Sequence, residues 1–389
     1  MTLKTRLSVL LISTPVLAFV LVGGLMGKQP DTDQTYAHLR VFEDVVSLVL
    51  HNYVEEVKVD RVMEGAMRGL ADGLDPDSAY LTAKEVRSVE NNEALPEGDV
   101  GLELTRQYYL RVIAARDGSP AAKNGLQTGD YVRAIDGKPT RDLSVFEGAR
   151  LLRGQPGSKV TLTIIRGNAA DPHELTLVRE KSSAPFVTSK MLAPDTGYVR
   201  IVAFRDGVVD EFRNHVAGVL KTGAKSLVID VRHTAEGTYE NGIAAARLFV
   251  KSGTLVVKGR DKAETGEKIE ARSGDGQFAM PVVVLVTTGT SGPAELFAAA
   301  LDSNERADLV GEHTLGRAGL QKLVKLPENR GLWLTYGRYL TAKGTSIHGK
   351  GLDPDVAVDE PDVEFGAPPS TEDPILSAGV ERLKTKHAA

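Results

Sequence analysis

The stretch VVLVTTGTSGPAELFAAALDSNERADLVGEHTLGRAGLQ, residues 283–321, decides the fold class of this chain. It begins inside the uninterrupted apolar run MPVVVLVT (280–287), which predicts a fully buried strand. A turn rich in glycine, threonine and serine follows, and Gly292–Pro293 then opens the apolar segment AELFAAAL. Proline suits the first position of a helix. A buried strand that turns directly into a buried helix is typical of an α/β layer.

The preceding segments continue this alternation of strand and helix. YVRIVAF (198–204) and KSLVIDV (225–231) predict two strands, and the apolar spacing within 208–219 predicts an amphipathic helix between them. NGIAAARLFV (241–250) predicts a further helix. We therefore expect these two strands and the strand at 280–287 to lie in one sheet.

Two different patterns precede the α/β segment. From 36 to about 86, apolar residues recur at three- and four-residue spacing, which predicts two helices followed by the turn LDPDSAYLT (74–82). Between 97 and 181 the pattern becomes β-rich, with the alternating strand KVTLTII (159–165). Ser144, with Glu147 three residues later, predicts a capped helix within this part.

The amino terminus has the features of a membrane signal. Lys4 and Arg6 precede an apolar run over 7–26, whose 20 residues are just long enough to cross a bilayer core of about 30 Å. No clear small-x-small cleavage pattern precedes Lys28, which favours an uncleaved anchor, with a cleaved signal peptide as the alternative. A buried soluble helix fits poorly because the run has no polar face. The expected location is the inner membrane, facing the periplasm or the cell exterior.

Composition excludes several classes of function. The 389 residues carry a formal charge of −5 and no dense basic run, so no nucleic-acid partner is expected. Zero cysteines exclude disulfides and thiolate chemistry. The eight histidines are scattered without an HExxH pair, so neither a metal site nor a cofactor is expected.

The segments above resemble, in the same order, the carboxy-terminal processing (tail-specific) protease family with its PDZ domain. The resemblance rests on 283–321, on LDPDSAYLT, and on the PDZ-like runs GSPAAKNGLQTGD (118–130) and YVRAIDGK (131–138). HGKGLDPDVAV (348–358) and DPILSAGVERLK (373–384) match the family's closing segments, so the likeness covers about 36–384.

This resemblance implies a multidomain α/β protein in which a PDZ domain is inserted between a helical region and a protease-like α/β core. The expected parts are a signal anchor or signal peptide (1–27), a linker (28–35), a helical region (36–96), a PDZ domain (97–181), the core (182–365) and a carboxy-terminal tail with a helix (366–389).

The resemblance also assigns the catalytic positions. The family has a nucleophilic serine, a lysine base twenty-five residues on and a glutamine four residues later; these positions hold Gly292, Arg317 and Gln321. Glycine has no nucleophile, and arginine stays protonated at any workable pH. The chain therefore resembles a catalytically degenerate member, with Arg317 expected to form a structural salt bridge to Glu295, Glu312 or Glu236.

A third departure lies in the segment that supplies oxyanion donors in the family. Its DLRxNPGG pattern corresponds to residues 230–237, where Glu236 replaces the first of the paired glycines. A carboxylate there would repel the charge that an oxyanion hole stabilises. Gly237 remains, which leaves a partial hole. Ser291 is a rescue candidate for the nucleophile, with His233 or His313 as its base.

The PDZ resemblance implies a peptide-binding groove. An extended peptide adds as a strand beside one edge, and backbone N–H groups hold its terminal carboxylate. The loop that would hold the carboxylate comprises Gly98, Val100, Gly101 and Leu102, and the facing helix offers Phe146 and Ala149; Asp99 would disfavour a carboxylate nearby.

Three hypotheses from different classes remain open. The first is a membrane-anchored homologue that binds polypeptide carboxy termini without cleaving them, as an adaptor or as a regulator of an active protease relative. The second is an active serine endopeptidase with Ser291 as a relocated nucleophile. The third is a structural envelope protein whose PDZ domain is an assembly surface. An unfolded protein substrate separates the first two, and dependence on a free carboxy terminus separates the first from the third.

Overall fold

The computed structural model describes residues 32–167, 171–182, 185–260, 265–367 and 370–388. The chain divides into two compact units, residues 1–66 and 67–389. The signal segment expected at 1–27 lies outside the described residues. The first helix, α2 (Thr32–Asn52), begins inside the range 28–35 that was expected to be a linker. The second predicted helix is α3 (Val59–Asp72).

The core of the second unit is a six-stranded sheet. Five of its strands are parallel, and β10 pairs antiparallel at one edge. The strand order is β10 (Val187–Ala193), β11 (Thr196–Ile201), β12 (Ser226–Asp230), β15 (Val282–Val286), β16 (Ala307–Gly311) and β19 (Val356–Ala357). Because β11, β12 and β15 are consecutive neighbours, the prediction that these strands share one sheet is confirmed.

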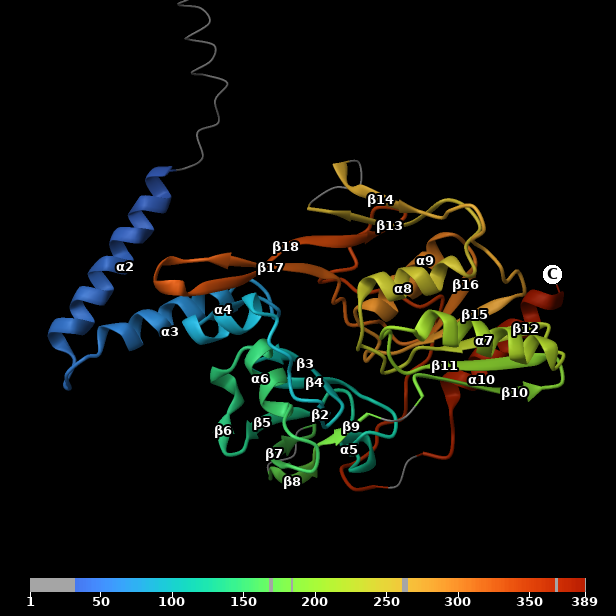
Figure 1. Ribbon diagram of the computed structural model, residues 1–389, viewed down its shortest axis with the longest axis horizontal. Coiled ribbons are helices and arrows are strands. Elements are labelled where there is room, and N and C mark those ends of the chain that lie inside the picture. Colours follow the sequence, from blue (N-terminus) through green and yellow to red (C-terminus); the bar gives the residue numbers. More distant parts are fainter. Residues whose placement is uncertain (1–31, 168–170, 183–184, 261–264, 368–369, 389) are drawn as a thin grey trace, which may run out of the picture. The chain divides into compact units, whose positions relative to one another are not determined.

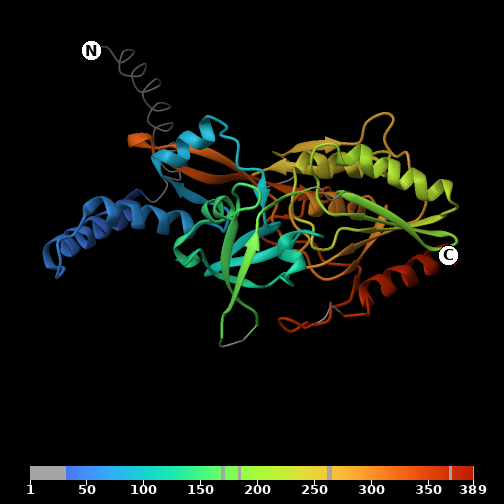
Figure 2. The same ribbon diagram turned by 60° about the horizontal axis from the view of Figure 1, so that its bottom comes forward.

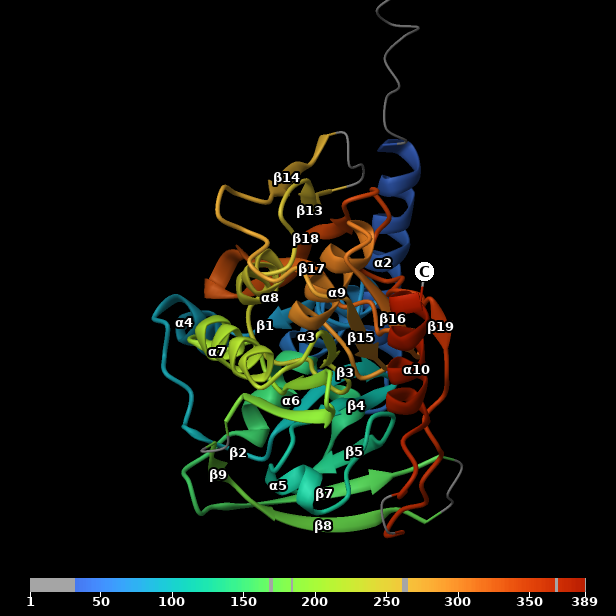
Figure 3. The same ribbon diagram turned by 90° about the vertical axis from the view of Figure 1, so that its right-hand side faces the viewer.

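Helices cover both faces of this sheet, as Figures 1 and 3 show. Alternate residues of a strand point to opposite faces. On β15, Val282 and Val284 pack into the cluster that contains the apolar faces of three helices: α7 (Val208–Lys221), α8 (Tyr239–Arg247) and α9 (Pro293–Ser303). Val283 and Leu285 pack on the other face, against α10 (Pro374–Ala388). The apolar run at 280–287 is thus buried on both sides.

A second sheet lies beside the core. Its central strand is the long β18, which pairs with three others. The strands are β1 (Ala79–Leu81), β17 (Gly319–Lys325), β18 (Gly331–Thr341), β13 (Thr254–Gly259) and β14 (Glu267–Glu270). β1 comes from the segment 74–82, which was expected as a turn alone. The hairpin β17–β18 runs from the core to the short helix α4 (Ala83–Glu90), as Figure 2 shows.

In the sequence, the PDZ part lies between β1 and the first strand of the core sheet. In the structure it forms a separate β-rich layer with its own apolar cluster. Leu104, Leu110 and Leu162 are central in its apolar cluster. Its elements are β2 (Gly98–Asp99), β3 (Leu102–Gln107), β4 (Tyr109–Ala115), α5 (Pro120–Lys123), β5 (Tyr131–Ile135), β6 (Lys138–Pro139), α6 (Val145–Leu152), β7 (Lys159–Ile165), β8 (His173–Val178) and β9 (Glu180–Lys181). The predicted capping box of Ser144 and Glu147 opens α6 as expected.

Candidate functional site

Gly292 lies at the turn between β15 and α9. Its backbone angles are φ 61° and ψ −118°, and its N–H donates to Glu295 one turn into the helix, over 3.0 Å. Such a strained strand-to-helix turn presents the nucleophile in many serine hydrolases. A Cβ atom here would lie 3.6–3.8 Å from its nearest neighbours, the carbonyl oxygens of Ala235 and Arg317 and the ring of Tyr239. The position therefore has room for a small side chain, but the glycine supplies none.

Glu295 joins this turn to the loop that carries Arg317. The buried carboxylate accepts N–H donors from Gly292, from Gly316 over 2.6 Å and from Arg317 over 2.8 Å, and it also accepts the hydroxyl of Thr314. Burial raises the pKa of Glu295, and these four donors oppose the rise. The two segments at the catalytic positions are thus held together through their main chains.

The guanidinium of Arg317 contacts Asp77 and the main chain of β3. Its Nε lies 2.9 Å from Oδ1 of Asp77, and one terminal nitrogen donates to the carbonyl of Leu104 over 3.4 Å. Burial alone would lower the pKa of Arg317, but Asp77 and Glu103 more than offset this and raise it. A structural ion pair was expected. Its partner is Asp77 rather than any of the three glutamates named from the sequence.

Gln321 and Tyr239 also lie near Gly292 and Arg317. Gln321 follows on β17 and donates to the hydroxyl of Thr335 over 3.3 Å. The hydroxyl of Tyr239 donates to the carbonyls of Gly319 and Arg317, over 3.0 and 3.3 Å. Burial raises the pKa of Tyr239 well above its usual range, so this phenol stays protonated and does not replace a base.

The segment expected to form the oxyanion hole lies beside the same turn. Gly237 has φ 126°, and a Cβ there would lie 2.2 Å from the carbonyl oxygen of Phe204, so only glycine fits. The carboxylate of Glu236 is held by two arginines: Nε of Arg205 lies 2.6 Å from Oε1, and a terminal nitrogen of Arg116 lies 2.8 Å from Oε2. The glutamate is therefore a fixed, paired anion in this loop.

Ser291 is completely buried one residue before Gly292. Its N–H donates to the carbonyl of Thr234 over 3.0 Å. Its Oγ has no hydrogen-bond partner within the part of the chain that the structure describes. A serine nucleophile requires a base within hydrogen-bond reach. The geometry around Ser291 therefore does not favour it as a nucleophile.

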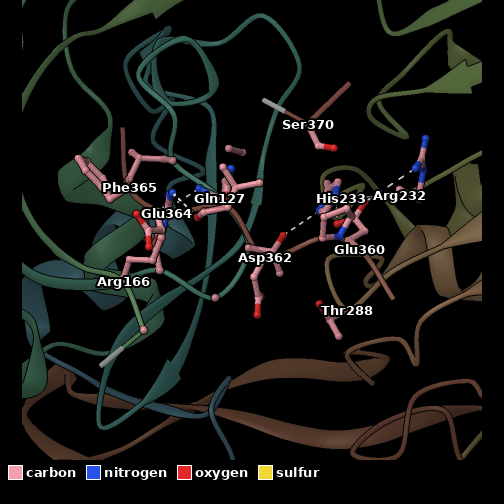
Figure 4. Close-up of a pocket in the computed structure, with 18 of the residues that line it drawn as sticks. Gln127, Arg166, Arg232, His233, Thr288, Glu360, Asp362, Glu364, Phe365 and Ser370 are labelled. Carbon is pink, nitrogen blue, oxygen red and sulfur yellow. Dashed lines mark hydrogen bonds and ion pairs between the residues drawn. The ribbon is translucent and has the colours of Figure 1, made fainter. Parts of the chain in front are cut away.

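The two histidines considered as bases both have other partners. Nδ1 of His233 lies 2.8 Å from the hydroxyl of Thr128, and Nε2 lies 3.0 Å from Oε1 of Glu360, beside it in Figure 4. His313 bonds through Nδ1 to Asp353 over 2.8 Å and through Nε2 to a main-chain carbonyl. Neither ring is bonded to Ser291.

A narrow cavity of about 80 Å³ lies between the PDZ groove and the loops that carry Glu236 and Arg317. Its PDZ side is formed by the carboxylate loop, the start of β3 and one face of α6. Its core side carries Ala235, Glu236 and Arg317. Of the residues expected to bind peptide, four line it: Val100, Gly101, Leu102 and Ala149. Asp99 also lines it, but Arg116 neutralises this carboxylate over 2.6 Å.

Two residues expected in the groove lie elsewhere. The N–H of Gly98 donates to the carbonyl of Gly154 over 3.1 Å, so it is not available to a carboxylate. Phe146 faces the other side of α6, where it packs against Trp333 with ring centroids 6.3 Å apart and lies under the guanidinium of Arg150. Its neighbour Val145 lines the cavity instead, because successive helical residues point in directions about 100° apart.

A larger cavity, of about 1020 Å³, lies on the other side of His233. It is bordered by the PDZ domain and by the segment that follows β19. Phe365 of that segment stacks on the ring of His173 at 4.1 Å and lies beneath the guanidinium of Arg166, as Figure 4 shows in part. Gly292 and Arg317 do not line this cavity, so we do not assign the catalytic positions to it.

Among the described residues, no group of three or more His, Cys, Asp or Glu side chains is placed to hold a metal ion. Within the same residues, no helix is both long enough and apolar enough to span a membrane.

Sequence reasoning missed three residues that decide the electrostatics of the site. Asp77 pairs with Arg317, while Arg116 and Arg205 hold Glu236. Asp77 lies in the quoted turn LDPDSAYLT, but only the fold brings it to Arg317. Arg116 lies two residues before the PDZ turn motif, and no pattern in the sequence links it to residue 236.

Fold and site together define an α/β core with a strand-to-helix turn of the serine-hydrolase kind, joined to a PDZ domain. Residues 195–358 match the model of peptidase family S41, and residues 111–166 match the PDZ domain. The chain belongs to the carboxy-terminal processing proteases of that family, as the resemblance predicted. The predicted fold class is confirmed with it.

Individual relatives agree with this assignment. The carboxyl-terminal-processing protease of Synechocystis sp. is 33% identical over 291 residues, covering 73% of this chain and 68% of that protein. The carboxy-terminal-processing protease of Bartonella bacilliformis is 29% identical over 332 residues, covering 84% and 76%. The solved structure of the photosystem II D1 C-terminal processing protease aligns with a TM-score of 0.68 at 26% identity, covering 82% of this chain and 92% of that one.

Proposed function

We propose that this chain is a membrane-anchored, extracytoplasmic member of its family that binds polypeptide carboxy termini without cleaving them. The observation that carries the proposal is the glycine at residue 292, in the turn where a nucleophile would stand. The protein would act as an adaptor, or as a regulator of an active protease relative.

The loss of cleavage follows from three groups of the site. Gly292 offers no atom to attack a carbonyl. Arg317 is a permanent cation tied to Asp77, so it has no free base to accept a proton. Glu236 places a negative charge in the loop where an oxyanion would need donors. The buried hydroxyl of Ser291, which has no partner among the described residues, gives no support to a relocated nucleophile.

Binding is the activity that the remaining chemistry supports. Val100, Gly101 and Leu102 border the cavity on the carboxylate-loop side, and Ala149 faces them from α6. Peptide addition at such an edge needs backbone groups and apolar pockets but no catalytic residue. A family member can therefore lose its chemistry and keep recognition.

The proposed location rests on the sequence of the first 27 residues. Two basic residues and a 20-residue apolar run favour export with the amino end left in the cytoplasm. Residues 1–35 fused to a reporter that is active only outside the cytoplasm should give signal. A stable fusion that stays silent would contradict this location.

The experiment that tests the binding function compares two versions of one labelled peptide that ends in Ala-Leu-Val. One has a free carboxylate and the other is amidated, which removes the charge. The full-length protein should bind the acid more tightly, although weakly in absolute terms, because a short added strand buries little area. Equal affinity for both would remove the carboxylate-reading function and favour a structural role for the PDZ domain.

A further inference from the structure

We propose that the carboxylate of Glu236 is an internal ligand of the PDZ groove, which holds Arg116 and so competes with the terminal carboxylate of a bound polypeptide. This inference rests on the proposed function, because it concerns the same groove. It assigns to Glu236 a second role beyond the loss of the oxyanion hole: the residue keeps the groove shut until a strong enough ligand displaces it.

Arg116 bridges the PDZ domain and the core through two carboxylates. Its guanidinium spans two carboxylates, Asp99 at 2.6 Å on the PDZ side and Glu236 at 2.8 Å on the core side. The side chains of Arg116 and Glu236 are only 7% and 13% exposed. Charge-assisted pairs of this kind, largely removed from water, are stronger than surface ion pairs.

Arg116 also lies beside the loop that would hold a terminal carboxylate. Its own N–H donates to the carbonyl of Gly101 over 2.8 Å, so its main chain is fixed to that loop. Its side chain lines the same cavity as Val100 and Leu102. A peptide whose carboxylate reached the loop would meet this guanidinium, and Glu236 already occupies one of its two sides.

The cavity is small compared with sites that hold ligands. Sites that hold small ligands usually enclose about 300–1,000 Å³. The groove here encloses about 80 Å³. Leu152 and Val145 of α6 line it together with Glu236, so these side chains narrow the space that a carboxy-terminal segment of several residues would occupy. Displacing Glu236 would widen it.

The charged side chains that line the cavity are balanced, so the loss of one carboxylate changes the net charge of the groove. Three arginines line the cavity, Arg116, Arg153 and Arg317, against three carboxylates, Asp99, Glu103 and Glu236. Neutralising one carboxylate leaves a net positive groove, which favours an incoming carboxylate. An internal carboxylate also has a high effective concentration at its site, so it competes well even when its own contact is modest.

The test compares Glu236→Gln with a matched control, Asp117→Asn, in the full-length protein. Asp117 also joins the PDZ domain to the core, through Arg200 at 3.0 and 3.1 Å, but it does not line the cavity. Both variants remove one carboxylate from an arginine pair across the same boundary. Affinity for the acid and amidated Ala-Leu-Val peptides is measured by fluorescence anisotropy, with thermal melting to confirm that each variant folds.

We expect Glu236→Gln to bind the acid peptide at least about fivefold more tightly than the unmodified protein, with little change for the amide and little effect of Asp117→Asn. If the unmodified protein prefers the acid and Glu236→Gln binds it no better, the inference is overturned and the proposed function stands. If both variants tighten binding equally, loosening of the domain contact explains the gain and the inference is also overturned. If no protein prefers the acid, the proposed function itself fails.

Discussion

Arg317 and Asp77 form an ion pair, with Nε 2.9 Å from Oδ1, at the position that the resemblance predicts for the family's lysine base. Asp77 is 7% exposed and Arg317 is 27% exposed, so the pair lies largely out of water. It joins the turn before β1 to the loop before β17. Arg317 is thus part of the packing between two segments that are distant in the sequence.

The first prediction concerns this pair. Arg317→Met should lower the free energy of unfolding by about 3 kcal/mol, because it leaves the carboxylate of Asp77 buried without its cation. Urea denaturation near neutral pH measures the loss. Arg317→Met combined with Asp77→Leu should recover much of it, since both charges are then removed. Equal losses for the single and double variants would show that the unpaired carboxylate of Asp77 is not the cause of the loss.

The second prediction concerns Ser291. Its buried hydroxyl has no hydrogen-bond partner among the described residues, so Ser291→Ala should leave the free energy of unfolding unchanged or raise it by up to about 1 kcal/mol. The neighbouring Thr290 is the control, because its Oγ1 donates to the carbonyl of Val231 and accepts from the N–H of Thr287. Thr290→Ala should cost about 1–2 kcal/mol. A comparable loss for Ser291→Ala would mean that its hydroxyl has a partner in solution.

Local patterns were sufficient to predict most elements of the fold. The apolar run at 280–287, Pro293 after Gly292, and the capping box of Ser144 and Glu147 each specify their element through nearby residues, and the structure contains all of them. The prediction that β11, β12 and β15 share one sheet followed from the helices between them, because parallel strands need such crossovers.

The site was less predictable because its electrostatics depend on long-range pairs. Asp77 and Arg317 are far apart in sequence, as are Arg116 and Glu236, and neither pair follows a spacing rule. Phe146 was misassigned for a different reason. Both faces of α6 are buried, one against the groove and the other against Trp333, and an apolar residue alone does not tell which face it joins.

The third prediction concerns pH and the buried Asp230. Burial tends to raise its pKa, but Arg200 and Arg232 lower it from an ordinary 3.8 to about 2. A carboxyl with a lower pKa in the folded state stabilises the fold above its unfolded pKa, and this contribution of about 2 kcal/mol is lost as the pH falls from about 4 through 2. Asp230→Asn should therefore be destabilised by about 3 kcal/mol near neutral pH and should differ less from the unmodified protein at low pH.

Asp210→Asn is the control for this measurement. Asp210 pairs with Arg213 on the surface of α7 and is 77% exposed, so its loss should cost less than about 0.5 kcal/mol at any pH. Urea midpoints are compared at about pH 7, 4 and 3. A constant difference between Asp230→Asn and the unmodified protein across this range would contradict the assigned linkage.

The fourth prediction concerns restoration of chemistry. Gly292→Ser alone should remain inactive on casein, because Arg317 still cannot take the proton. Gly292→Ser with Arg317→Lys has a better chance, and adding Glu236→Gly should improve it by removing the charge from the oxyanion loop. Release of acid-soluble fragments measures activity. Turnover by Gly292→Ser alone would contradict the role assigned to Arg317.

The central claim is that the chain binds carboxy termini and leaves them intact. Its most direct test is mass spectrometry of the free-acid Ala-Leu-Val peptide and of an unfolded protein, each recovered after prolonged incubation with the purified full-length protein. We expect both to be recovered at their starting masses. Shortened products that form with the unmodified protein and disappear with Ser291→Ala would contradict it and establish an active serine endopeptidase.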